Sequence, residues 1–471
     1  NPHFIHAVNE RGFARIVKRV AQPYYIICGF GDTGSLLARG LSDHHLGAVV
    51  LDKDPERIKA LSLRDYTVPM PGLCADASVP KYLVDAGVQK PECKAVVILI
   101  HDDDVVLKVA VVAKFLNPDV EVICRSTSER HKEHLQSLDK VRVVDPFEIF
   151  AQLLSMAISN PPLHNLNSWL VRARQIELGE PLEVPRGEWI LCGYGRMGRW
   201  LHKYMIEAGI DTTIIDPEAN EDVDSSRVIR EHADPRTLKE AGIETVAGVV
   251  ACTDSDSDNL SILLDTQALN PRAFSITRQN AHENQIAFDA AKADLTLQAS
   301  LTTARRVLKL LISPLIQVLI DHLRERDQSA TEQVIRSLKS VIGDQSPHLW
   351  RVILCGDEAV AVTEFLDAGG ELTLGDLTKH PDHADESLTC VPLMVGRDGG
   401  SLMFPSDSEQ VFKDDEIVFC GTEGSERLLR ATVNNPYTLH FLATGRELPR
   451  GYVFQWLSRL RGGSVQTSVG T

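Results

Sequence analysis

Hydrophobic residues along the chain occur in short continuous runs, and longer segments with leucines at helical spacing separate them. The run 24–28 is followed by leucines at positions 36, 37 and 41, and then by the run 48–51. Short apolar runs are typical of strands buried on both faces of a parallel sheet, and the segments between them are typical of covering helices. This alternation predicts an α/β fold with doubly wound, Rossmann-like parallel sheets.

The whole pattern occurs twice. The loop 29–34 reads Gly-Phe-Gly-Asp-Thr-Gly and follows the first strand, and Asp52 ends the second strand. The loop 193–198 reads Gly-Tyr-Gly-Arg-Met-Gly, and Asp216 stands in the place of Asp52. In both copies 18 residues separate the third glycine from the acid. Chance rarely produces such a constant spacing, so we infer an internal repeat.

Further landmarks keep the same order. Residues 75–77 and 233–235 share an Ala-Asp pair before a helical segment, and Arg125 and Arg278 each stand seven residues after an Asn-Pro pair. The two copies therefore extend over roughly 22–150 and 187–300, in tandem.

The glycine loops suggest a nucleotide site. A G-x-G-x-x-G loop between a strand and a helix lets the backbone approach a pyrophosphate, which then lies on the free N–H groups of the helix N-terminus. Asp52 and Asp216 are placed to accept hydrogen bonds from ribose hydroxyls, and this favours NAD or ADP over NADP. We therefore expect at least one copy to bind such an adenine nucleotide. The alternative is a Rossmann-like fold with an empty or degenerate pocket.

The two loops differ in charge. Arg196 in the second loop places a cation near the expected pyrophosphate, whereas Asp32 in the first loop places an anion there. Asp32 either caps the following helix or weakens phosphate binding. Arg125 and Arg278, at the ends of later strands, either reach the phosphates or form surface ion pairs.

Charge and composition argue against several classes of partner and function. The net charge of −16 argues against nucleic acid and anionic lipid as partners, since both need a cationic surface. The nine cysteines are scattered, which is typical of thiols in a reducing compartment. Acid clusters at 102–104 and 254–258 allow a calcium site, although acids are also expected in the first turn of a helix. We find no catalytic constellation, so we expect no enzyme.

Apolar segments at 147–158 and 301–324 follow the two copies. Each needs a partner face, either on its own domain or on a neighbouring copy of the chain, which would produce a homo-oligomer. From about residue 349 the pattern changes to short strands with glycine turns, which predicts a small α+β domain.

Taken together, these motifs resemble the N-terminal lobe of RCK domains (regulators of potassium conductance), which also occur in Trk-type potassium uptake subunits. The segments 391–405 and 413–421 resemble the C-terminal ligand-sensing lobe of that family. The first copy departs from the family because it lacks an obvious C-terminal lobe, and Asp32 puts phosphate binding at its loop in doubt. Together the glycine motif and the resemblance give these expected nucleotide-binding residues: Gly29, Gly31, Asp32, Thr33, Gly34, Asp52, Lys53, Asp76, Ala77, Arg125, Gly193, Gly195, Arg196, Met197, Gly198, Asp216, Asp234, Thr253 and Arg278.

The resemblance implies a cytoplasmic gating module on the inner membrane that converts nucleotide binding into opening or closing of a transmembrane potassium pore. It implies a tetrameric ring of eight lobes. Residues 1–21 resemble the linker from a pore helix, and with the non-Met start they favour a channel over a free-standing Trk subunit. An NAD-dependent oxidoreductase and a sensing scaffold unrelated to transport are the other classes. The expected parts are a linker at 1–21, the first lobe at 22–158, a connection at 159–186, the second lobe at 187–345, the C-terminal lobe at 346–435 and a tail at 436–471.

Overall fold

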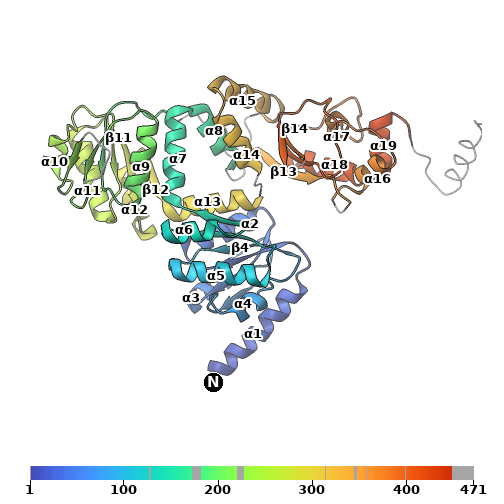
Figure 1. Cartoon of the computed structure of the whole chain (residues 1–471), viewed down its shortest axis with the longest axis horizontal. Helices are drawn as coiled ribbons and strands as arrows, with labels where there is room; N and C mark the ends of the chain where they lie inside the picture. The colour runs from blue at the N-terminus through green and yellow to red at the C-terminus, as the bar shows by residue number, and fades with distance from the viewer. Residues whose placement is uncertain are drawn as a thin grey trace, which may run out of the picture. The chain divides into compact units, whose positions relative to one another are not determined.

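A computed structural model describes residues 2–126, 129–171, 182–219, 227–312, 315–343, 347–356, 358–397 and 399–447. Within this range it forms two compact units, and each is described by itself (Figure 1). The first unit contains the described residues within 1–165 and 180–312, and the second contains those within 166–179 and 313–471. Residues 172–181 of the expected connection and 448–471 of the expected tail lie outside the described residues.

The first repeat is a six-stranded, fully parallel sheet in the order β3-β2-β1-β4-β5-β6. Its elements are α1 (Pro2–Arg19), β1 (Tyr24–Cys28), α2 (Asp32–Asp43), β2 (Gly47–Asp52), α3 (Pro55–Ser62), β3 (Gly72–Cys74), α4 (Pro80–Asp85), β4 (Cys93–Ile98), α5 (Asp103–Leu116), β5 (Glu121–Arg125), α6 (Glu129–Gln136) and β6 (Val141–Val144), followed by α7 (Pro146–Ser159) and α8 (Pro161–Val171). The strand order reverses between β1 and β4, where such folds open a crevice at the carboxyl ends of the strands.

The second repeat has the same topology, in the order β12-β11-β10-β7-β8-β9. Its elements are β7 (Trp189–Cys192), α9 (Arg196–Glu207), β8 (Thr212–Ile215), β9 (Arg227–Ile229), α10 (Pro235–Glu240), β10 (Gly248–Ala251), α11 (Asp256–Leu269), β11 (Phe274–Gln279), the short 3₁₀ helix η1 (His282–Asn284), α12 (Gln285–Ala291), β12 (Leu295–Gln298) and α13 (Ala299–Ile312). The expected fold class, two Rossmann-like domains in tandem, is confirmed.

The second unit is built on a four-stranded antiparallel sheet in the order β13-β16-β14-β15. Its elements are α14 (Leu315–Arg324), α15 (Gln328–Ile342), β13 (His348–Ile353), α16 (Val360–Asp367), α17 (Leu374–Thr378), β14 (Cys390–Arg397), β15 (Gly400–Met403), β16 (Glu416–Gly421), α18 (Glu423–Val433) and α19 (Pro436–Thr444). We expected the segment up to residue 345 to belong with the second repeat. The structure instead packs α14 and α15 on this sheet.

The helices that follow the two repeats are exchanged between them. Helix α7 follows the first repeat but packs on α9 of the second, and its Phe147 and Leu154 share a core with Trp189 and Leu201 (Figure 1). The apolar segment 147–158 thus finds its partner face on the other repeat of the same chain.

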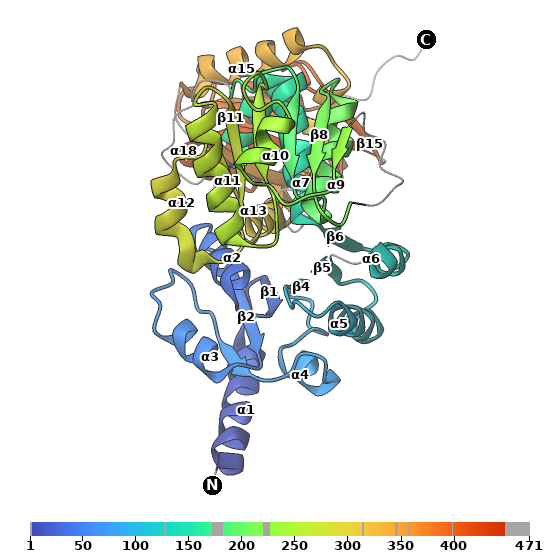
Figure 2. The ribbon, with the colours of Figure 1, turned by 90° about the vertical axis from the view of Figure 1, so that its left-hand side faces the viewer.

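Helix α13 follows the second repeat but packs on α2 of the first (Figure 2). Its Val307 and Leu310 join the core that contains Leu37 and Leu41. The two helices come so close at Gly40 that a Cβ there would lie 2.6 Å from Cδ2 of Leu308. This close approach joins the two repeats into one unit.

Helix α1 is anchored in the first repeat. Phe13 and Val17 are buried in its core. Glu10 pairs with Lys81 at 2.6 Å and accepts a hydrogen bond from the Tyr82 hydroxyl at 3.0 Å. The segment that we expected to be a linker contains a helix that packs on the first repeat. No helix among the described residues combines the length and the apolar composition that crossing a bilayer requires.

The exchange predicts that Leu310→Ala, although it lies after the second repeat, destabilises the first. Leu310 is 5% exposed, and truncating such a leucine typically costs about 2–5 kcal/mol. Hydrogen exchange should show faster opening of β1, β2 and α2 in this variant. Leu264→Ala on α11, where the leucine is 69% exposed, is the matched control and should leave them unchanged. Equal effects of the two substitutions would contradict the exchange.

Candidate functional site: the cavity at the first glycine loop

A cavity of about 410 Å³ opens at the carboxyl ends of the first sheet. Nine of the expected first-copy residues line it: Gly29, Gly31, Asp32, Thr33, Gly34, Asp52, Lys53, Asp76 and Ala77. Arg57, His101 and Ser300 also line it. None of these three was among the expected binding residues.

The outer glycines of each loop are required by the fold. Gly29 has φ +102°, a conformation that side chains rarely adopt, and a Cβ on Gly34 would lie 2.2 Å from the carbonyl oxygen of Gly29. The second loop repeats this geometry, with φ +102° at Gly193 and 2.1 Å between a Cβ on Gly198 and the oxygen of Gly193. These four glycines therefore follow from the tight turn between strand and helix alone.

The middle glycines are not required by the fold. Gly31 and Gly195 have φ −77° and −69°, which any residue adopts. A Cβ on Gly31 would meet only the guanidinium of Arg57, at 3.6 Å, and a Cβ on Gly195 would meet nothing within 4 Å. Both are helix N-caps, where Ser, Asp or Asn would stabilise the helix better. The turn itself does not require a glycine here, whereas a ligand lying on the backbone does.

The two acids hold the loops. In the first copy, the carboxylate of Asp52 accepts N–H bonds from Phe30 at 2.5 Å and from Asp54 at 2.8 Å. Asp216 does the same in the second copy, with Tyr194 at 2.5 Å and Glu218 at 2.7 Å. A carboxylate has about four acceptor positions, so both can still take a hydroxyl. The acid that we expected to bind ribose thus also fixes the loop that a pyrophosphate would touch.

Cations face the first cavity. The guanidinium of Arg57 lies 3.5 Å from the carboxylate of Asp52, and its side chain is 51% exposed. Burial, followed by the charges of Arg125 and Arg57, lowers the pKa of His101, so its imidazole stays neutral at pH 7. An anion in the cavity would offset the charges that disfavour the imidazolium. Arg57 follows Asp52 by five residues, a signal available in the sequence.

We had considered that Asp32 caps the following helix, and the structure shows that it does not. The N-cap is Gly31, and no side chain caps this end of α2. Asp32 is instead an exposed residue of the first turn, where the helix dipole favours a carboxylate. It lines the cavity, so its charge acts on any ligand there.

The three expected arginines gather around the second loop. Burial and then the charge of Arg196, with a smaller contribution from Arg278, lower the pKa of Arg125. Arg196 and Arg278 both lie over the ring of Phe147, at 5.2 and 4.7 Å from its centroid, and Arg278 pairs with Asp254 at 2.5 Å. The charge of Arg125 therefore acts on His101, and the charges of Arg196 and Arg278 act on Arg125.

The exchanged helices bring different residues to the two loops. Ser300, at the start of α13, lines the first cavity, whereas Phe147, at the start of α7, packs under the arginines of the second loop. The first site is therefore completed by a small polar residue and the second by a buried aromatic ring.

The remaining expected residues have other partners. Met197 is fully buried in the core of the second repeat. Asp234 caps α10, and the Thr237 N–H that it accepts lowers its pKa. Thr253 exchanges hydrogen bonds with the buried amide of Asn259. These three side chains serve the fold of the second repeat.

The acid clusters are used within the chain. Asp102 caps α5, Asp104 lies 3.0 Å from His131, and Asp256 accepts hydrogen bonds from Asn280, Ala281 and Asn284. Across the described ranges, no group of three His, Cys, Asp or Glu side chains is placed to hold a metal ion.

Comparisons with known proteins identify the family of both repeats. The model of the TrkA-N domain matches residues 25–146 and again residues 189–299. The Trk system potassium uptake protein TrkA homolog of Methanothermobacter thermautotrophicus is 30% identical over 168 residues, which are 34% of this chain and 76% of the relative. The chain belongs to the TrkA-N domain family.

Other relatives of this TrkA-N protein are matched over less of their length. Potassium channel protein 1 of Methanocaldococcus jannaschii is 23% identical over 158 residues, 32% of this chain and 47% of the relative. A third curated relative is covered over 25% of its length. Among solved structures, the GsuK channel bound to NAD matches 88% of this chain and 79% of its own, with 14% identity and a TM-score of 0.49.

The loop geometry predicts that two alanine substitutions lower the free energy of unfolding by different amounts. Gly34→Ala forces a methyl group into the Gly29 carbonyl and should cost about 1–3 kcal/mol of unfolding free energy. Gly31→Ala meets only the end of a flexible side chain and loses only a moderate N-cap preference, so it should cost about 0.5–1 kcal/mol. Urea denaturation measures both. A large loss in Gly31→Ala would show that the middle glycine serves the fold.

Proposed function

We propose that this chain is the regulatory part of a potassium transport system, and that it binds an adenine nucleotide of the NAD or ADP class at the first TrkA-N repeat. The observation that supports this proposal most strongly is Gly31. The turn does not require a glycine at this position, and Gly31 lines a cavity of about 410 Å³ beside Arg57. In this proposal the pyrophosphate lies on the N-terminus of α2 and the ribose hydroxyls on Asp52.

The first repeat is the main nucleotide site in this proposal. Its cavity is completed by Ser300, which leaves room, whereas Phe147 and Asp254 already engage the arginines of the second loop. The sequence alone favoured the second loop, because Arg196 places a cation near its expected pyrophosphate. The cations of the first cavity come instead from Lys53 and Arg57.

The proposed nucleotide regulates by changing how the two repeats pack. A ligand in the cavity touches the loop before α2 and Ser300 at the start of α13, the two helices that join the repeats. A ligand shifts an equilibrium between two arrangements only by its difference in affinity, and a hundredfold difference corresponds to about 2.7 kcal/mol. Helix α1, anchored through Phe13 and Val17, carries the movement outward.

The proposed partner is a transmembrane potassium pore at the cytoplasmic face of the inner membrane, on the same polypeptide or on a separate subunit. The proposed assembly is a homo-oligomer, a tetramer with eight lobes. The potassium channel and Trk uptake proteins among the relatives support transport as the process that is regulated.

We expect Arg57→Gln and Gly31→Ala each to weaken ADP and NAD binding about tenfold, which is about 1.4 kcal/mol. The first removes a charge-assisted contact, and the second places a methyl group against the pyrophosphate. Calorimetry on the full chain measures the affinities. Lys59→Gln, on the same helix and 66% exposed, is the matched control. Unchanged affinity in both test variants, with weakening in Arg196→Gln instead, would assign the site to the second repeat.

We also expect potassium flux through the complete transport system to depend on cytoplasmic nucleotide. Currents or rubidium uptake in reconstituted vesicles should change with ADP or NAD, and Arg57→Gln should shift the response to about tenfold higher nucleotide. The Lys59→Gln protein should respond like the wild type. Flux that ignores the nucleotide, in a protein shown to bind it, would separate the binding site from the proposed regulation.

A further inference from the structure

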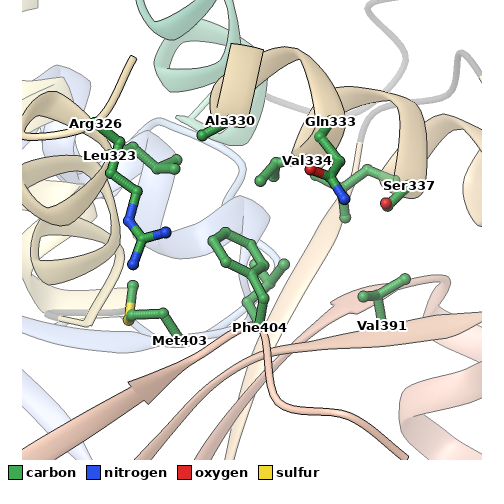
Figure 3. A pocket seen from close by; sticks show the side chains of 11 residues that line it. Leu323, Arg326, Ala330, Gln333, Val334, Ser337, Val391, Met403 and Phe404 are labelled. Carbon is green, nitrogen blue, oxygen red and sulfur yellow. The ribbon is translucent and has the colours of Figure 1, made fainter. Parts of the chain in front are cut away.

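The C-terminal domain contains a cavity of its own. It has a volume of about 270 Å³ and lies between α15 and the strands β14 and β15 (Figure 3). The residues that line it are Leu323, Arg326, Ala330, Gln333, Val334, Ser337, Leu338, Val391, Leu393, Met403 and Phe404. Neither the nucleotide proposal nor the family comparison uses these residues.

The walls of the cavity are apolar. Leu323, Val334 and Leu338 come from the helices and Leu393 from the sheet, and all four are buried. Such walls favour an apolar body over water, because binding removes the apolar surface of the ligand and of the walls from water.

Phe404 is held in an unusual conformation at this cavity. Its φ is +49°, which is strained for a bulky residue, and its N–H donates to the carbonyl of Leu393 at 2.9 Å. Its ring points toward Ala330 and Val334 on α15, and the residue is 37% exposed (Figure 3). The strained backbone thus places an aromatic ring in an open slot instead of in the core.

One end of the slot carries a positive charge. Arg326 lies in the turn between α14 and α15, and its guanidinium lies above Met403, with Gln333 and Ser337 at the opposite end (Figure 3). Among the described residues, no hydrogen bond or ion pair engages this guanidinium. The nearby Arg324 differs, because it lies 3.9 Å from Asp321.

We propose that this cavity binds a small carboxylic acid with an apolar body. The carboxylate takes the two parallel N–H groups of Arg326, and the body lies between α15 and the sheet, against Phe404 and Leu393. The chain has a net charge of −16, so no general attraction for anions replaces the local one. The site is independent of the nucleotide cavity, because a different unit supplies its residues.

The test uses calorimetry on the full chain with octanoate, and with octan-1-ol as the neutral analogue of the same length. Octanoate should bind at least tenfold more tightly than octan-1-ol. Arg326→Gln should remove this preference and leave octan-1-ol binding unchanged, whereas Arg324→Gln should bind both like the wild type. Ala330→Phe, which fills the slot, should abolish binding of both.

A second readout locates the ligand. The chain has six methionines, so ¹³C-methyl-methionine spectra are simple, and Met403→Leu assigns the relevant signal. Octanoate should shift the Met403 signal in the wild type and not in Ala330→Phe. No octanoate binding up to about 10 mM, or equal effects of Arg326→Gln and Arg324→Gln, would overturn the proposal. Light scattering that shows a dimer abolished by Ala330→Phe, without octanoate binding, would assign the cavity to a second copy and also overturn it.

Discussion

The burial of two apolar helices against each other's repeats is the constraint on which the first unit depends. A Rossmann sheet needs helices on both faces, and here the last covering helix of each repeat is supplied by the other. Val307 and Leu310 complete the core of the first repeat, and Phe147 and Leu154 complete that of the second. Neither repeat can keep its core closed if the other moves away. The pairing of the repeats is therefore as stable as their cores.

This constraint also decides how the two loops differ. Both have the same backbone, down to φ +102° at the first glycine and the same pair of N–H bonds to the acid. The exchanged helices begin beside these loops, and they bring Ser300 to one and Phe147 to the other. The two loops therefore share one backbone conformation. They differ in chemistry because Ser300 and Phe147, at the starts of the exchanged helices, are different side chains.

Much of this could be predicted from the sequence. The strands, the glycine loops and the acids lie within stretches of about 30 residues, where periodicity and spacing are informative. The exchange of helices could not be predicted. It joins residues that are distant in the sequence: the Tyr25 hydroxyl donates a hydrogen bond to the backbone carbonyl of Leu311 at 3.4 Å. An apolar helix face in a sequence does not show which surface it will pack against. For the same reason the sequence offered Arg125 only a phosphate or a surface ion pair, and the influence of Arg196 and Arg278 of the other copy on its charge could not be predicted.

The site and the constraint meet in His101. Burial and the charges of Arg125 and Arg57 lower the pKa of its imidazole. The charges of Arg196 and Arg278 in the second repeat in turn help to lower the pKa of Arg125. Because the folded chain disfavours the imidazolium, protonation costs stability as the pH falls below the ordinary histidine pKa of about 6.5. An anion in the first cavity offsets those cations and raises the pKa of His101. The exchanged helices hold the two repeats together, and the charges of Arg196 and Arg278 in the second repeat thus act on Arg125 of the first.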